Sequence, residues 1–466
     1  MTADAELCGL DAGALQAAFR SRRLSPVEVI DNALARMDET EPALNAFVAR
    51  CDAQARAEAR AAEARHRAGV PLGPLDGVPV SVKDLIEVAG MPCTFGSRSM
   101  LGHVPRADAP SVARLRAAGA IVVGKTATSE FGYKGYTESP VHGVTRNPRD
   151  LARTPGGSSG GAAASVAAGV TPIALGTDGG GSIRSPAALT GLVGIKAQFG
   201  RVPVWPASAT PTLAHVGPLA RTVADARALL EVIAGPDRRD HSSLLPAMLP
   251  ATPVTGLRVA FSPTLGYGRV LPEVAGPVAE AVDVLRGLWP GMVEIEAPFP
   301  DPAEILAVEF IGGCSARLAD TLASAPETID PPLRAAIAAL SARSAADYAR
   351  VVAERMEHRA RLAHLFEGID LLLTPTTPTP AWPLGSGVPP GFEDATVWSY
   401  FTYPFNLTGQ PAASLPCGLT DSGLPVGLQI VAPPQCEAML CAALAAAEQA
   451  LSLPPRPLPL LSSGVP

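Results

Sequence analysis

The chain has 466 residues, of which 47 % are hydrophobic and 17 % charged, and its formal net charge is −7. So high an apolar content excludes a disordered chain, and the acidic balance argues against nucleic acid as a direct partner. The seven cysteines are scattered without a CxxC pair and no HExxH motif occurs, which predicts free thiols and no metal site. Without a signal-like N-terminus or a bilayer-spanning apolar run, the sequence predicts a cytoplasmic protein with no membrane segment.

Helical patterns fill the first 70 residues or so, and one of these helices has Ser25 as its cap and Pro26 at its first position. A strand over 78–82 is expected to end at Lys83. Further strands are expected at 120–123, 170–175, 370–374 and 426–431, and helices at 52–68, 109–118, 221–234, 277–288, 332–342, 345–366 and 437–450. This alternation predicts a three-layer α/β protein. The Pro-rich segment 374–390 is interpreted as a surface loop rather than a domain boundary.

Residues 119–126 read GAIVVGKT and match the phosphate-loop pattern GxxxxGK[ST]. The residues between the two glycines are Ala, Ile, Val and Val, and β-branched side chains favour an extended strand. A phosphate loop follows a strand and does not fill one. We therefore predict a buried strand here and no ATP site.

The stretch 155–169, PGGSSGGAAASVAAG, is similar to the GxSxG turn that presents the nucleophile of α/β-hydrolases. That turn needs an apolar strand directly before it, whereas the polar, proline-broken TRNPRDLARTP precedes this one. The stretch therefore does not favour Ser158 or Ser159 as a nucleophile. A Ser-His-Asp esterase remains an alternative, with one of four histidines as its base: His215, His241, His358 or His364.

A serine further along the chain is better placed for catalysis. The apolar VTPIAL leads into GTDGGGSIRSPAAL, so three glycines precede Ser182 and a helix is expected after it. A glycine run at a strand-to-helix turn lets several backbone N–H groups point at one spot, which an oxyanion hole requires. A tight turn with a capping serine accounts for the same residues. This stretch alone leaves both interpretations open.

The run GGSSGGAAASVAAGVTPIALGTDGGGSIRSPAALTGLVGIKAQFGRV resembles the signature of the amidase signature family of serine hydrolases. Four other segments are also similar to that family: GVPVSVKDLIEVAGMPCTFGS, RADAPSVARLRAAGAIVVGKTATSEF, DLLLTPTTPTPAWPLG and YPFNLTGQPAASLPCGLTDSGLPVGLQIV. The resemblance implies a single domain over 1–466 with a three-layer α/β/α sandwich, in which helices flank a large mixed, twisted β-sheet. It is weakest at about 256–366, which we expect to be a variable segment on the substrate side.

The resemblance also implies a catalytic triad of Lys83, Ser158 and Ser182. Ser182 would attack the amide carbonyl, Lys83 would be the base, and Ser158, following a cis Gly157–Ser158 bond, would relay the proton. Lysine acts as a base only when neutral, and burial would lower its pKa. Asp84 would oppose that shift if it lay close to the amine.

The remaining family positions surround the turn before Ser182. The resemblance assigns the oxyanion hole to backbone N–H groups there, and three further residues would hold the turn in place. The oxyanion hole would be formed by Gly179, Gly180, Gly181 and Ser182. The turn would be held by Ser159, Asp178 and Arg184. The chain departs from the family where Gly179 replaces the common Thr and where KAQFGR at 196–201 replaces KPTxGR. The first departure is expected to loosen the turn or to widen the pocket mouth.

The function that the resemblance implies is hydrolysis of C–N bonds in acyl- or aryl-amides and carbamates (urethanes), without metal or cofactor. The alternative is a glutaminase component for tRNA-dependent amidation, similar to the A-subunit of an amidotransferase, and the intact triad argues against a silent binding protein. A small amide or carbamate is the expected partner, and a homodimer is left open. If they line the pocket, five aromatic residues would favour an apolar substrate, and they fit equally well as residues of the core. These are Tyr133, Tyr136, Trp205, Phe401 and Tyr403.

Overall fold

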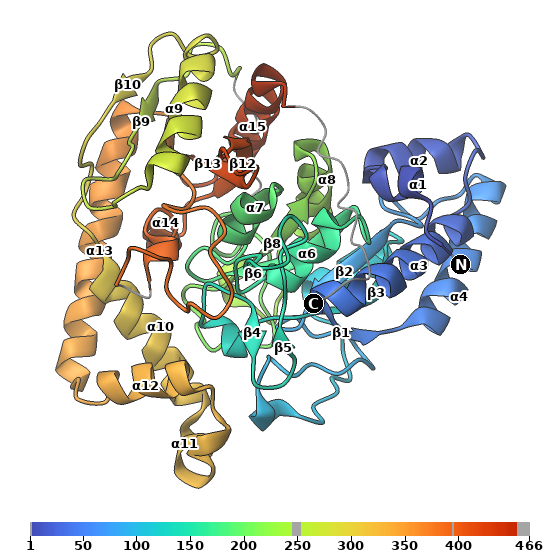
Figure 1. The fold of residues 1–466 in the computed structure, drawn as a ribbon, viewed down its shortest axis with the longest axis horizontal. Helices are drawn as coiled ribbons and strands as arrows, with labels where there is room; N and C mark the ends of the chain where they lie inside the picture. Colours follow the sequence, from blue (N-terminus) through green and yellow to red (C-terminus); the bar gives the residue numbers. More distant parts are fainter. Residues whose placement is uncertain (1, 245–252, 394–395, 454–466) are drawn as a thin grey trace.

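A mixed sheet of 11 strands forms the centre of the computed structural model, which describes residues 2–244, 253–393 and 396–453 (Figure 1). The strands lie in the order β1-β3-β2-β6-β8-β7-β12-β13-β11-β9-β10. Their bounds are β1 Phe47–Arg50, β2 Pro79–Lys83, β3 Ile121–Thr126, β6 Ile173–Asp178, β7 Val193–Lys196, β8 His215–Ala220, β9 Val259–Phe261, β10 Val293–Glu294, β11 Leu371–Pro375, β12 Ala412–Leu419 and β13 Pro425–Val431. A separate hairpin pairs β4 (Glu138–Ser139) with β5 (Gly143–Val144).

The sheet has parallel strands in two groups, with antiparallel strands between them. The strands β3, β2 and β6 run parallel, and β8, β7, β12 and β13 add antiparallel neighbours. β11, β9 and β10 are parallel to one another, while β11 is antiparallel to β13. Since β2 and β6 are parallel, their carboxyl ends lie at the same edge of the sheet, so Lys83 and Asp178 end neighbouring strands.

Helices cover both faces of the sheet, as the two sets of apolar clusters show. One face packs against α2 (Ala12–Arg20), α5 (Pro110–Ala117), α8 (Val223–Ile233), α9 (Pro272–Arg286) and α15 (Glu437–Leu451). The other face packs against α3 (Pro26–Leu44), α4 (Asp52–Ala68), α6 (Gly160–Ala167), α7 (Arg184–Thr190), α13 (Ala345–Gly368) and α14 (Pro404–Thr408). The predicted three-layer α/β architecture is confirmed.

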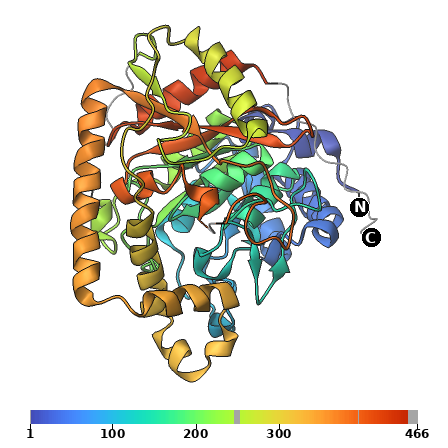
Figure 2. The same ribbon diagram turned by 60° about the vertical axis from the view of Figure 1, so that its left-hand side comes forward.

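The remaining helices lie at the edges of the sandwich. α1 (Ala5–Gly9) contacts α3, and α10 (Ala303–Arg317), α11 (Ala319–Ser324) and α12 (Pro331–Leu340) extend from one side, next to α13 (Figure 2). Within the described ranges, every helix is too short or too polar to cross a lipid bilayer.

Most of the elements expected from the sequence are present, with three corrections. The GAIVVGKT stretch is strand β3, buried throughout, as predicted. α9 begins at Pro272, so Pro277 lies inside that helix and does not start it. The prediction of a surface loop at 374–390 is wrong for its first part, which is buried up to Trp382 and lines the core beside β13. Several elements have no counterpart among the predicted ones, including the helices α10, α11 and α14, and the strands β1, β7, β8, β9, β10 and β12.

A capping box begins α3. The Ser25 hydroxyl accepts hydrogen bonds from the backbone N–H groups of Val27 and Glu28, and the Glu28 carboxylate accepts one from the Ser25 N–H at 2.7 Å. These contacts satisfy N–H groups that a helix start otherwise leaves without partners.

We expect Ser25→Ala to lower the free energy of unfolding by about 1 kcal/mol, because that cap is lost. Chemical denaturation would measure this change. The matched control is Ser324→Ala at the exposed end of α11, whose hydroxyl donates only to the carbonyl of its own helix. A Ser25→Ala change no larger than that of the control would contradict the prediction.

Candidate active site

The turn between β6 and α7 carries a cluster of backbone donors. The N–H groups of Gly179, Gly180, Gly181 and Ser182 find no acceptor in the part of the chain that the structure describes. Gly181 has a φ of 140°, and a Cβ there would lie 2.2 Å from the Thr402 Oγ1 atom, so a side chain at this position would clash. Adjacent unpaired N–H groups at a strand-to-helix turn are suited to bind an anionic oxygen.

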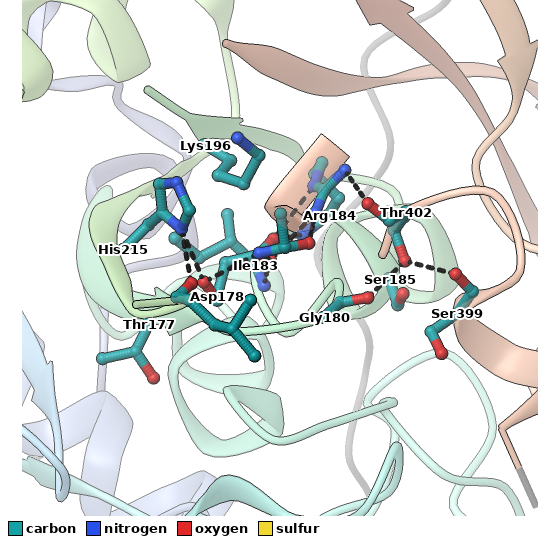
Figure 3. A network of polar contacts seen from close by, with 12 residues as sticks. Thr177, Asp178, Gly180, Ile183, Arg184, Ser185, Lys196, His215, Ser399 and Thr402 are labelled. Atoms are coloured by element: carbon teal, nitrogen blue, oxygen red, sulfur yellow. Dashed lines mark hydrogen bonds and ion pairs between the residues drawn. The ribbon is translucent and has the colours of Figure 1, made fainter. Parts of the chain in front are cut away.

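A buried ion pair between Asp178 and Arg184 stabilises this turn (Figure 3). Arg184 donates to both carboxylate oxygens of Asp178, at 2.9 and 3.0 Å, and both side chains are fully buried. Arg184 also donates to Gln429, Asn406 and the Thr402 carbonyl at 2.6–2.9 Å. Burial alone would raise the pKa of Asp178, but the charge and hydrogen bonds of Arg184, the charge of Lys196 and the hydrogen bond of Asn406 together outweigh burial and hold this pKa well below its ordinary value.

Lys83, the last residue of β2, is fully buried among three hydroxyl groups. Its Nζ atom lies 2.7 Å from Ser158 Oγ, 2.8 Å from Ser159 Oγ and 2.9 Å from Thr177 Oγ1. Burial lowers the pKa of Lys83 well below its ordinary value, and Asp178 opposes this only in part. Lys83 therefore loses its proton more readily than an ordinary lysine.

Asp84 does not counteract this shift, although it follows Lys83 directly. Its carboxylate is paired with Lys125, at 2.8 Å between Oδ1 and Nζ, and accepts two hydrogen bonds from Thr94. The lysine of the phosphate-loop-like stretch thus has a structural partner in the core, and among the described residues no carboxylate forms an ion pair with Lys83.

The direction of the hydrogen bonds around Lys83 follows from the Ser159 hydroxyl. Ser159 donates to the Thr177 carbonyl at 3.1 Å, so it must accept from Lys83. A neutral amine has two protons and one lone pair, and if the second proton goes to the Thr177 hydroxyl, the lone pair faces Ser158. In that arrangement Ser159 and Thr177 would orient the amine so that it could take a proton from Ser158. Thr177, the residue before the end of β6, is not among the site residues predicted from the sequence.

Ser158 and Ser182 line the same cavity, which has a volume of about 250 Å³. The peptide bond between Gly157 and Ser158 is cis, as the resemblance implies. Thr177, Gly179 and His215 line this cavity as well. The three residues of the implied triad are therefore gathered at one place, because Lys83 contacts Ser158 and Ser158 shares the cavity with Ser182.

Of the four histidines considered as a base, only His215 lines this cavity. Its Nδ1 atom lies 2.7 Å from the Leu213 carbonyl and 3.1 Å from the Asp178 carbonyl, so no carboxylate orients the ring as in a Ser-His-Asp triad. Burial lowers the pKa of His215 well below its ordinary value. His358 is buried against Phe299, and the other two, His241 and His364, are exposed. The arrangement gives no support to a histidine base.

The five aromatic residues divide between cavities and core. Trp205 lines the first cavity, while Tyr133 and Tyr136 line a second one of about 800 Å³ that reaches Gly180. Phe401 and Tyr403 are fully buried in the core. Within the described ranges, His, Cys, Asp and Glu side chains do not gather in groups of three or more that could hold a metal ion.

Comparison with known proteins shows which family the chain belongs to. The family model described as Amidase matches residues 28–441. The A-subunit of glutamyl-tRNA(Gln) amidotransferase from Chloroflexus aurantiacus is 39% identical, covering 93% of this chain and 95% of its own, and the acylamidase of Rhodococcus erythropolis is 36% identical, covering 91% of each. A bacterial aryl acylamidase of the amidase signature family superposes with a TM-score of 0.87 at 30% identity, over 95% of this chain and 96% of its own. The chain therefore belongs to the amidase signature family, whose enzymes act on C–N bonds.

Proposed function

We propose that this protein is a serine hydrolase that cleaves the C–N bond of acyl- or aryl-amides through an acyl-enzyme on Ser182. The observation that carries the proposal is a fully buried Lys83 within 2.7 Å of Ser158, in a site where Ser158 and Ser182 share one cavity. A fully buried lysine whose pKa is lowered and whose amine contacts a serine of a cavity is a candidate for a functional residue. The neighbouring turn offers N–H donors for the oxyanion.

The proposed reaction has two halves. Ser182 Oγ attacks the carbonyl carbon, its proton passes to Ser158 Oγ, and the proton of Ser158 passes to Lys83 Nζ. The N–H groups of the glycine turn bind the negative oxygen. When the C–N bond breaks, the relay returns a proton to the departing amine, which leaves Ser182 as an ester. Water, activated by the same relay, then adds to the ester carbonyl, and the acid leaves.

A second candidate function is favoured by the names of the relatives. Several sequences at 38–39% identity are A-subunits of glutamyl-tRNA(Gln) amidotransferases. In that role the same site would release ammonia from a glutamine side chain and would need partner proteins. The two candidates differ in whether the chain purified alone hydrolyses simple amides: turnover of p-nitroanilides, primary amides or carbamates favours the stand-alone hydrolase, and activity that needs a partner protein favours the second.

Labelling with a fluorophosphonate tests the assignment of the nucleophile. We expect one adduct, located on Ser182 by peptide mapping, because the oxygen that attacks an amide also displaces fluoride from phosphorus. Ser182→Ala should abolish the label. Ser165→Ala is the matched control, since this buried serine of α6 contacts Thr171 and lines neither cavity, and it should leave the label intact. An adduct on another serine, or an unchanged label in Ser182→Ala, would refute the assignment.

A further inference from the structure

Two cavities meet at the glycine turn. The first, of about 250 Å³, is lined by Gly179, Ser158 and Ser182, and the second, of about 800 Å³, is lined by Gly180 and by side chains of α10 and α12. Gly132 and Phe310 line both cavities. Because Gly132 has no side chain, the ring of Phe310 is the side chain that stands between the two spaces.

The position of the Phe310 ring depends on the missing side chain of Gly179. A Cβ atom at residue 179 would lie 3.0 Å from Phe310 Cε2, which is closer than ordinary van der Waals contact. The ring therefore takes space that a threonine at residue 179 would need. On this basis, the departure at Gly179 does not simply widen the pocket mouth, because Phe310 fills the vacated space.

Close packing fixes α10, the helix that carries Phe310. A Cβ at Gly313 would lie 2.2 Å from the Ala209 carbonyl oxygen, so the helix backbone is pressed against the loop 203–210 that lines the first cavity. Leu306, one turn before Phe310, lies against Gly180, where a Cβ would be 3.7 Å from its Cδ1 atom. These contacts hold α10, which carries Phe310, against the loop 203–210 and the glycine turn.

The second cavity is apolar next to the turn and charged at its rim. Its lining includes Leu306, Ile311, Ala336, Leu340 and Trp398. Glu304 and Arg343, which also line it, are about half exposed and paired with each other at 2.8 Å, and the buried Lys134 is paired with Asp330 at 2.7 Å. The charges that line this cavity are thus paired, so it suits a neutral hydrocarbon group.

The proton relay indicates which part of the substrate enters each cavity. The departing amine must receive its proton from Ser158, and Ser158 lines the first cavity but not the second. The amine therefore belongs in the first cavity. The acyl group, on the other side of the carbonyl carbon, is directed past Gly180.

We propose that Phe310 is a specificity-determining residue, and that the acyl chain of the substrate passes between Phe310 and Gly180 into the α10–α12 cavity. This inference rests on the proposed amidase function and adds a substrate class to it. The preferred substrates are amides of long or bulky apolar acids with an amine small enough for about 250 Å³.

Two series of substrates test this assignment. In p-nitroanilides of linear acids from acetic to decanoic acid, kcat/KM should rise about fourfold for each methylene that enters the apolar cavity, the factor that follows from the transfer of one CH2 group. Ala336→Trp, which fills the cavity from α12, should flatten that rise. The matched control is Ala335→Trp on the exposed face of α12, which should keep the wild-type profile.

The second series varies the amine on a fixed acetyl group. Phe310→Ala joins the two spaces, so kcat/KM for the bulky naphthylamide should rise at least about tenfold relative to the p-nitroanilide. An Ala336→Trp variant that changes the amine series instead of the acyl series would overturn the assignment, as would a flat acyl profile in a wild-type enzyme that cleaves short amides. If no amide of either series is cleaved and no fluorophosphonate adduct forms, the proposed function itself fails, and this inference with it.

Discussion

Replacing Arg184 by methionine is expected to lower the free energy of unfolding by about 3–5 kcal/mol, because it leaves the charge of Asp178 buried without its partner. Both side chains are fully buried, and Arg184 also donates to Asn406, Gln429 and the Thr402 carbonyl. These contacts join the glycine turn to α14 and β13. The loss should be measured by equilibrium unfolding in urea.

The control for this prediction is an ion pair of similar length on the surface. Arg227 and Glu231 lie 2.7 Å apart on α8 with both side chains more than half exposed, so Arg227→Met should change the stability by no more than about 0.5 kcal/mol. The double variant Asp178→Leu with Arg184→Met should recover part of the loss, since it removes both charges. Equal losses in Arg184→Met and Arg227→Met would show that the buried network does not stabilise the fold.

Local patterns predicted much of the fold because they act within a few residues. Ser25 and Pro26 mark the start of α3, and the β-branched run before Lys125 forms β3 and not a phosphate loop. The same reasoning failed where tertiary contacts decide. The first part of the Pro-rich segment after β11 is buried, with Ala381 and Trp382 packed against Leu189 of α7, and nothing in the composition of the segment reveals this distant contact.

The site shows the same division. Lys83, Ser158 and Ser182 could be named because the family resemblance covers their motifs, and the turn glycines could be named from their conformational freedom. Asp178 could be named with Arg184 because both flank the turn, but Asn406 and Gln429 could not, since they are more than 200 residues away from Arg184 in the sequence. α10, with Phe310, falls in the segment least like the family, where no motif guides prediction.

Lys83→Met is expected to lower kcat by about 10²–10⁴-fold, the usual contribution of a general base. In the wild type, kcat should rise with pH as Lys83 loses its proton, and because burial lowers its pKa, this rise should lie well below the pH at which an ordinary lysine titrates. Rate profiles against pH on one amide would measure both effects. If Lys83→Met keeps the wild-type kcat and the same rise of kcat with pH, Lys83 is not the base.

The same lowered pKa links stability to pH, with a sign opposite to that of a salt-bridged lysine. Between the folded-state pKa of Lys83 and its unfolded value, the unfolded chain binds one more proton, so the stability of the wild type rises with pH by up to about 1.4 kcal/mol per unit relative to Lys83→Met. Lys196 is a matched control, because it is also fully buried with a lowered pKa but lines neither cavity. In Lys196→Met, the free energy of unfolding should rise less steeply with pH, as in Lys83→Met. The rise of kcat with pH should stay as in the wild type, because Lys196 does not exchange a proton with Ser158.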